Sequence, residues 1–175
     1  MTEFWIPHSM PRILDRLPSG CPAALLLRHS VRGPLPPGRA GYSIPLLPVG
    51  VELAEQFGAM LGPRLRTLNT SPLDRCMQTA AAISKGAGVA RSTTVDRTLG
   101  DPGSFVVDGK KGGRLWRELG HEKVMSHLVA GTGPLPGLAV PAAAAEELVQ
   151  SMLSVAGDEA GIHVFVTHDS LVTAA

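Results

Sequence analysis

Three short segments of the chain contain the side chains best suited to chemistry. They are Arg28, His29 and Arg32 in "RHSVR", Arg75 in "SPLDR", and His168 and Asp169 in "THDS". Each segment follows a predicted strand. Ligands of open α/β sheets collect outside the carboxyl ends of the strands, where loops and helix N-termini converge. Three strand ends therefore could bring three arginines and two histidines into one small volume.

The expected guest of such a cluster is a phosphoryl group. Cations at this density repel one another unless an anion lies among them, and a phosphoryl group matches the donor fork of each guanidinium. Nearby arginines also disfavour the charged imidazolium, so His29 should stay neutral and keep a lone pair for attack. A neutral imidazole that faces a charge-neutralised phosphorus is a nucleophile with a target.

The elements that must position these residues alternate between strands and helices. The expected strands are 23–28, 67–71, 92–97 and 162–167. The expected helices are a weak one at 11–17, then 49–61, 72–86 and 114–129, and an amphipathic stripe from Ala145 to Ala156. The run at 23–28 is typical of a strand buried on both faces. This alternation predicts an α/β three-layer domain with a mostly parallel central sheet flanked by helices.

Two segments are expected to be irregular and to wall the pocket. Residues 33–48 contain five prolines and three glycines, so a loop should occupy most of that span. Residues 100–113 should form an exposed irregular segment with Lys110 and Lys111 at its tip.

The three segments together resemble a known family. "RHSVRGP" looks like the Arg-His-Gly-x-Arg-x-Pro signature of the histidine phosphatase superfamily. "SPLDRCMQTA" resembles its second-arginine segment, and "VTHDS" resembles its late His-Asp pair. The match is in the family's order, from residue 23 to 170, and implies the phosphoglycerate mutase-like fold.

The resemblance implies a mechanism and a set of roles. His29 would attack phosphorus and become a phosphohistidine, while phosphoryl oxygens would be bound by Arg28, Arg32, Arg75 and His168. Water would then hydrolyse the intermediate. Neither a metal nor an organic cofactor is implied.

The resemblance offers two candidates for the acid that protonates the departing oxygen. In acid-phosphatase-like and phytase-like members the aspartate of the His-Asp pair serves, which would be Asp169. In mutase-like members an acidic residue on a loop past the middle of the chain serves, and Asp101 in "LGDPGSF" would be that residue.

The sequence departs from the family pattern at two places. Ser30 stands where the family usually has glycine, so either the backbone there tolerates a side chain or the pocket is altered. The chain also stops six residues past Asp169, where the family normally continues. We expect one domain over residues 1–175, either compact or truncated at its C-terminus.

Bulk properties set the expected partners and location. Sixteen basic and fifteen acidic side chains give a net charge of +1, so no global field favours nucleic acid or an anionic membrane. No apolar run is long enough to cross a bilayer, and no secretory signal is visible, so we expect a cytoplasmic protein. Cys21 and Cys76 lack the spacing of a zinc or redox motif, and packing is their expected role. The expected partner is a small phosphorylated substrate.

The leading functional hypothesis is a metal-independent phosphatase that hydrolyses a phosphate monoester through a phosphohistidine on His29. A phosphoglycerate mutase-like phosphotransferase is the nearest alternative. A catalytically silent phosphoryl-binding module is another, and Ser30 is the feature that keeps it open. A metallohydrolase using His29, His168 and Asp169 as ligands is disfavoured, because three neighbouring arginines would oppose a bound dication.

Overall fold

The computed structural model describes residues 5–34, 43–131 and 133–174, and its strands form a four-stranded sheet. The strands are β1 (Pro22–Arg28), β2 (Leu65–Thr70), β3 (Thr93–Val95) and β4 (Gly161–Thr167). Their spatial order is β1-β4-β2-β3, and each pair of neighbours is parallel. The predicted parallel central sheet is therefore confirmed.

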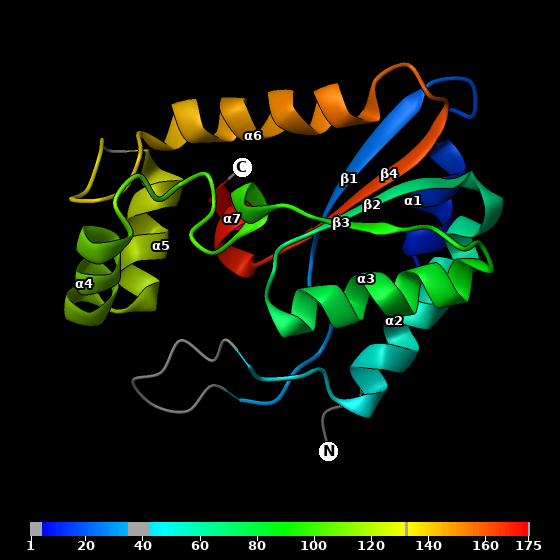
Figure 1. Ribbon diagram of the computed structural model, residues 1–175, viewed down its shortest axis with the longest axis horizontal. Helices are drawn as coiled ribbons and strands as arrows, with labels where there is room; N and C mark the ends of the chain where they lie inside the picture. The colour runs from blue at the N-terminus through cyan, green and yellow to red at the C-terminus, as the bar shows by residue number, and fades with distance from the viewer. Residues whose placement is uncertain (1–4, 35–42, 132, 175) are drawn as a thin grey trace.

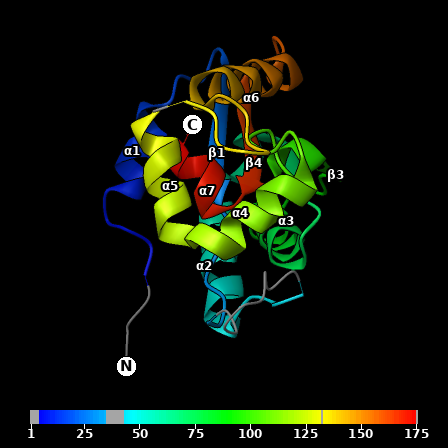
Figure 2. The same cartoon turned by 90° about the vertical axis from the view of Figure 1, so that its left-hand side faces the viewer.

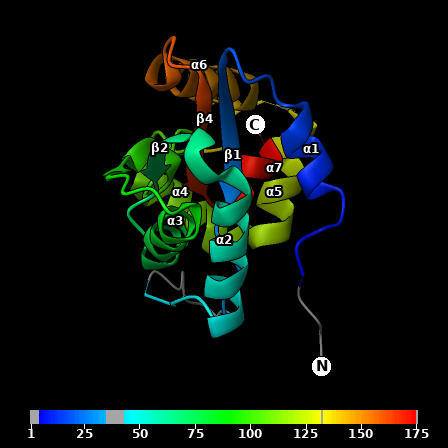
Figure 3. The ribbon, with the colours of Figure 1, turned by 90° about the vertical axis from the view of Figure 1, so that its right-hand side faces the viewer.

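Helices cover both faces of this sheet. They are α1 (Met10–Arg16), α2 (Pro48–Leu61), α3 (Asp74–Ala87), α4 (Gly109–Leu119), α5 (His121–Ala130), α6 (Pro141–Ala156) and α7 (Asp169–Ala174), with short 3₁₀ turns at Gly62–Arg64 and Arg97–Leu99. Helix α6 runs along one side of the sheet, and α2 and α3 lie on the other (Figures 1 and 3). Helices α4, α5 and α7 gather at one end (Figure 2). The predicted three-layer α/β fold is confirmed.

Strand β4 is the centre of the hydrophobic core. All seven of its residues are buried, and successive side chains point to opposite faces of the sheet. Ile162, Val164 and Val166 belong to a cluster with residues of α1, α2 and α3, whereas Phe165 belongs to a second cluster with residues of α4, α5, α6 and α7. Two apolar clusters thus clamp the strand that leads directly into "THDS".

Strand β1 packs on both faces, as the sequence predicted, but it is less deeply buried than expected. Its apolar run "AALLL" predicted burial on both faces, but β1 lies at the edge of the sheet and its residues are half-buried. Leu25 and Leu27 pack on one core cluster, and Ala24 and Leu26 pack on the other. An apolar run predicts that both faces of a strand are covered by other elements. It does not predict whether a second strand pairs along each edge of that strand.

The segment around residue 110 also differs from the prediction. Residues 109–113 were expected to be irregular, but they form the first turns of α4. The Asp108 carboxylate caps this helix, because it accepts hydrogen bonds from the backbone N–H groups of Lys110 and Lys111, both at 3.0 Å. The single helical segment predicted at 114–129 is two helices, which break at Gly120 with a φ of +81°.

Helices α2 and α3 approach each other through glycines. A Cβ on Gly58 would collide with the Ile83 carbonyl oxygen, and one on Gly86 would collide with that of Glu55. A third glycine, Gly50 at the start of α2, packs in the same way on the backbone of Val31. Helix α2 therefore holds in place both α3 and the loop that follows β1.

Most of the Pro/Gly loop predicted at 33–48 lies outside the described residues. Its described ends come together in an antiparallel bridge between Arg32 and Leu46. Among the described helices, none combines the length and the apolar character that a membrane crossing requires.

Candidate active site

The carboxyl ends of three strands lie side by side, with β4 in the middle. The backbone N–H of His29 donates to the Thr167 carbonyl at 2.9 Å, and the backbone N–H of Ser71 donates to the Val166 carbonyl at 3.0 Å. These two bonds hold His29, which follows β1, and Ser71, which follows β2, on either side of the end of β4, where His168 begins the next segment. The "RHSVR", "SPLDR" and "THDS" segments therefore meet at the carboxyl-terminal end of the sheet.

His29 has the geometry of a neutral nucleophile. Its side chain is buried, and its Nδ1 lies 2.8 Å from the Ser30 carbonyl oxygen, which can only accept, so Nδ1 carries the proton. The opposite nitrogen, Nε2, is buried and has no hydrogen-bond partner among the described residues. The lone pair of the ring is therefore on Nε2 and available for attack.

Burial is the main reason why His29 is neutral. Burial lowers the pKa of His29 to about 4, although the hydrogen bond to the Ser30 carbonyl acts in the opposite direction. Arg28, Arg75 and Arg32 lower the pKa further. The sequence reasoning attributed the neutral ring to these arginines alone, whereas the protein interior contributes the larger part.

His168 is also neutral, and both of its nitrogens are engaged. Arg75 donates through Nη2 to Nδ1 at 3.3 Å, so the proton is on Nε2, which donates to Ser71 Oγ at 2.9 Å. Burial lowers the pKa of His168 to about 3, and the positive charge of Arg75 adds to this effect. The ring lies edge-on to His29, with 5.7 Å between the ring centroids. In this state His168 orients Arg75.

The arginines surround His29 from separate elements. Arg28 is the last residue of β1, Arg32 is in the loop that follows, and Arg75 is in the first turn of α3. Arg32 donates through Nη1 to the Gly33 carbonyl at 2.8 Å, while its buried Nε has no hydrogen-bond partner among the described residues. A buried guanidinium N–H without a partner is costly, and an anion at the site would satisfy it.

Asp169 belongs to the cluster, but its carboxylate is paired. Its Oδ2 lies 3.7 Å from Nε of Arg28, and both side chains are about two-fifths exposed. Burial alone would raise the pKa of the Asp169 carboxyl, but Arg28 and the other surrounding charges and donors outweigh burial and lower it. Asp169 is therefore a carboxylate that orients Arg28 at neutral pH.

Asp101 approaches the site through its neighbour Gly100. A Cβ on Gly100 would lie 2.7 Å from the His168 ring and 2.6 Å from Ser71 Oγ, so the backbone here touches the ring directly. The Asp101 carboxylate itself contacts Arg97, with Oδ2 3.0 Å from Nη2. The residue before Asp101 thus contacts His168, whereas the Asp101 side chain itself is paired with an exposed arginine.

Ser30 has a backbone conformation that any residue adopts. Among the described residues other than glycine, Asp101 alone has a positive φ. The two polar main-chain groups of Ser30 are used: the carbonyl accepts from His29, and the N–H donates to Thr79 Oγ1 at 3.0 Å. Of the two outcomes expected for serine in place of glycine, the structure shows the first: the backbone tolerates the side chain.

Three residues that the sequence did not assign to the site complete it. Ser71 accepts from the His168 ring, Thr79 accepts from the Ser30 N–H, and Cys76 lies with its Sγ 3.7 and 3.8 Å from the two ring nitrogens of His168. Burial raises the pKa of the Cys76 thiol to about 12, so it packs against His168 as a neutral group. The sequence could have indicated all three through their position, because they lie within "SPLDRCMQTA", the segment that contains Arg75.

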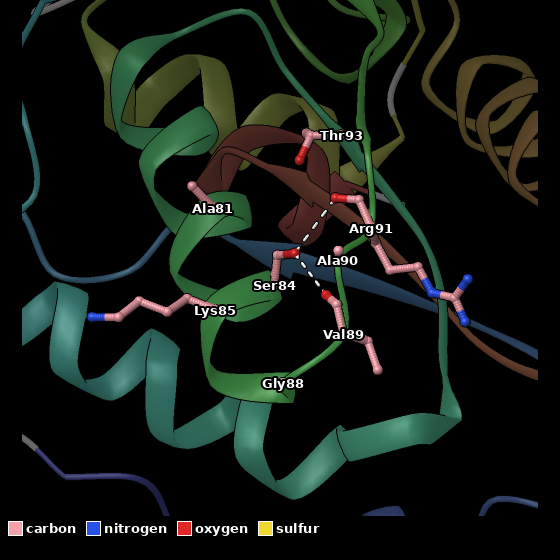
Figure 4. A pocket seen from close by; sticks show the side chains of 8 residues that line it. All are labelled: Ala81, Ser84, Lys85, Gly88, Val89, Ala90, Arg91 and Thr93. Carbon is pink, nitrogen blue, oxygen red and sulfur yellow. Dashed lines mark hydrogen bonds between the residues drawn. The ribbon is translucent and has the colours of Figure 1, made fainter.

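A separate hollow of about 480 Å³ lies between α3 and β3 and shares no residue with this cluster (Figure 4). Its two cationic side chains, Lys85 and Arg91, extend to opposite sides (Figure 4). Lys85 pairs with Glu55 at 2.7 Å, and Arg91 donates to the Leu65 carbonyl at 3.2 Å. The hollow therefore lacks the convergent charges of the histidine–arginine cluster.

Comparison with protein families gives a match over most of the chain. The model of the histidine phosphatase superfamily (branch 1) matches residues 26–173. This span contains the three segments that meet at the carboxyl-terminal end of the sheet. Among curated proteins, no sequence matches at a significant level.

Solved structures with a similar fold come from several organisms. A phosphoserine phosphatase of Entamoeba histolytica, solved with 3-phosphoglyceric acid, is 18% identical with a TM-score of 0.57, over 87% of this chain and 77% of its own. A mycobacterial glucosyl-3-phosphoglycerate phosphatase is 19% identical with a TM-score of 0.53, over 85% and 74%. A mycobacterial hydrolase is 19% identical with a TM-score of 0.55, over 85% and 68%. At these identities the likeness shows a shared fold.

Proposed function

This chain belongs to the histidine phosphatase superfamily, and we propose that it is a phosphomonoesterase that works through a phosphohistidine on His29. The observation that carries the proposal is the buried Nε2 of a neutral His29, which has no partner among the described residues and lies within the field of three arginines. A lone pair in that setting is suited to attack on phosphorus.

The proposed first step forms the bond between His29 Nε2 and phosphorus and breaks the bond from phosphorus to the departing oxygen. Arg28, Arg32 and Arg75 bind the phosphoryl oxygens and offset the charge that develops on them. His168 donates to a phosphoryl oxygen once it is protonated, and a bound dianion favours that form. In the second step water attacks the phosphohistidine, and inorganic phosphate and neutral His29 are released.

We assign the protonation of the departing oxygen to Asp101 rather than to Asp169. Asp169 is held as a carboxylate by Arg28, which suits it to orient that arginine and not to donate a proton. Asp101 follows Gly100, whose backbone contacts the His168 ring. This role requires the Asp101 side chain to rotate away from the exposed Arg97, which costs little because exposed ion pairs are weak.

The central test is turnover of 4-nitrophenyl phosphate in the presence of a chelator. The wild-type chain should hydrolyse it, and His29→Gln should abolish hydrolysis and the acid-labile phosphoenzyme trapped by rapid quenching. His163→Gln is the matched control, because His163 is equally buried but bonds Thr67 and the Glu159 carbonyl. Full turnover by His29→Gln would sink the proposal. Vanadate binding without hydrolysis of any phosphate ester would instead identify a silent phosphoryl-binding module.

Substrates with different leaving groups distinguish Asp101 from Asp169 as the proton donor. With 4-nitrophenolate, which departs without a proton, Asp101→Asn should retain most of the wild-type rate. With an alkyl phosphate, which needs the proton, it should lose about 10²-fold or more. Asp169→Asn should weaken turnover of both substrates by the same factor, because it disturbs Arg28. The reverse pattern would move the donor role to Asp169.

A further inference from the structure

The buried hydroxyl of Thr79 links the helix of Arg75 to the loop of His29. Thr79 lies one turn beyond Arg75 in α3, and its Oγ1 donates to the Arg75 carbonyl at 2.7 Å. The same oxygen accepts the backbone N–H of Ser30 at 3.0 Å. A hydroxyl has one proton, and because that proton is used within the helix, the lone pairs of Oγ1 are free to face Ser30.

The consequence reaches the nucleophile in one further step. The Ser30 residue anchored by Thr79 offers its carbonyl to Nδ1 of His29 at 2.8 Å, and this bond decides which ring nitrogen carries the proton. A shift of the Ser30 backbone would lengthen that bond and release the ring to the other tautomer. The Nε2 position would then carry a proton and could not attack.

We propose that Thr79 is a positioning residue, whose hydroxyl holds Ser30 so that His29 presents the unprotonated Nε2 to the phosphoryl group. This role rests on the phosphatase function proposed above. It also accounts for serine in place of the family's glycine, since position 30 acts through its main-chain groups, and both of them are bonded.

A purely structural threonine would behave differently. A helical threonine that bonds the carbonyl four residues earlier contributes little to helix stability. Its loss would leave the Ser30 N–H without an acceptor, and so lower stability. That reading predicts a drop in the melting temperature with normal kinetics in the folded protein. A positioning role predicts a defect in kcat and in the His29 tautomer at temperatures where the variant is fully folded.

The kinetic experiment compares Thr79→Val, which keeps the shape and loses the hydroxyl, with Thr79→Ser, which keeps the hydroxyl. With 4-nitrophenyl phosphate, Thr79→Val should lower kcat at least about tenfold with KM within about twofold, while Thr79→Ser should stay within about threefold of wild type. Thr67→Val is the control, because the Thr67 hydroxyl bonds His163 at 3.0 Å and does not contact the site. A wild-type kcat in Thr79→Val would overturn the proposal.

A second readout does not need turnover. In protein labelled with ¹⁵N-histidine, the His29 ring should show the Nδ1–H tautomer in the wild type and in Thr79→Ser, and a mixture of tautomers in Thr79→Val. If the valine variant does not fold, Thr79→Cys replaces it, since sulfur accepts the Ser30 N–H poorly. Should the wild type hydrolyse no ester, the phosphatase function fails, and this spectrum still decides Thr79: an unchanged tautomer in the variant refutes its role.

Discussion

The sharpest prediction concerns the proton on His29 at acid pH. Burial lowers the pKa of this ring to about 4, against an ordinary value of 6.5. When the pH is lowered from 7 to 5, a ring with a pKa near 4 stays about 90% neutral, whereas an ordinary histidine falls to about 3% neutral. The supply of nucleophile at pH 5 therefore differs about thirtyfold between the two cases.

The direct assay is an NMR titration of the free protein, followed through the His29 ring proton and assigned by its loss in His29→Gln. The ring should titrate below pH 5. In parallel, kcat/KM for 4-nitrophenyl phosphate, corrected for ionisation of the substrate, reports groups of the free enzyme and should lose only about a tenth through protonation of His29 between pH 7 and 5. Titration of the ring near pH 6.5, with kcat/KM falling about 25-fold between pH 7 and 5, would show that burial does not lower the pKa of His29.

Three further predictions concern stability and reactivity. The pKa values of His29 and His168 in the folded protein are about 4 and about 3, so as the pH is lowered the unfolded chain takes up these two protons before the folded chain does. The free energy of unfolding that is present above pH 6.5 therefore decreases as the pH decreases. Each ring should cost about 2 kcal/mol between pH 7 and 5 in urea melts, and an acid-insensitive midpoint would contradict this. Gly100→Ala forces a side chain into a backbone with φ +147° against the His168 ring, and should destabilise by about 1–3 kcal/mol and weaken vanadate binding; unchanged binding would argue against the contact. Ellman's reagent should titrate exposed Cys21 in the native protein and reach Cys76 only after denaturation, so two fast thiols would contradict the burial of Cys76.

The sequence predicted the sheet and the meeting of the three strand ends because both depend on strong local signals. The apolar run "IHVFVT" predicts a buried strand, and a polar residue directly after such a run lies at the carboxyl end of that strand. The helix at Gly109 was missed for an equally local reason. "GKKGG" has poor helix propensity, and the cap that starts this helix is the lone carboxylate of Asp108.

What the sequence could not provide are the interactions made by common residues across long separations. The Thr79 hydroxyl and the Ser30 N–H are 49 residues apart, and Ser71 Oγ and His168 are 97 apart. Serine and threonine occur throughout any chain, so residue type alone does not single them out. The ion pair of Asp169 with Arg28, which bears on the choice of proton donor, also depends on side-chain directions that only the folded chain fixes.

The strand order has a consequence for how the protein is made. β1 and β2 do not pair with each other; each pairs with β4, the last of the described strands in chain order. During synthesis, β1 therefore has no pairing strand until residues 161–167 leave the ribosome. Until then its leucines are exposed and can contact other chains. The same event delivers His168 beside His29. Completion of the described sheet and assembly of the histidine–arginine cluster are thus one step, so a nascent chain should acquire this cluster only when β4 docks.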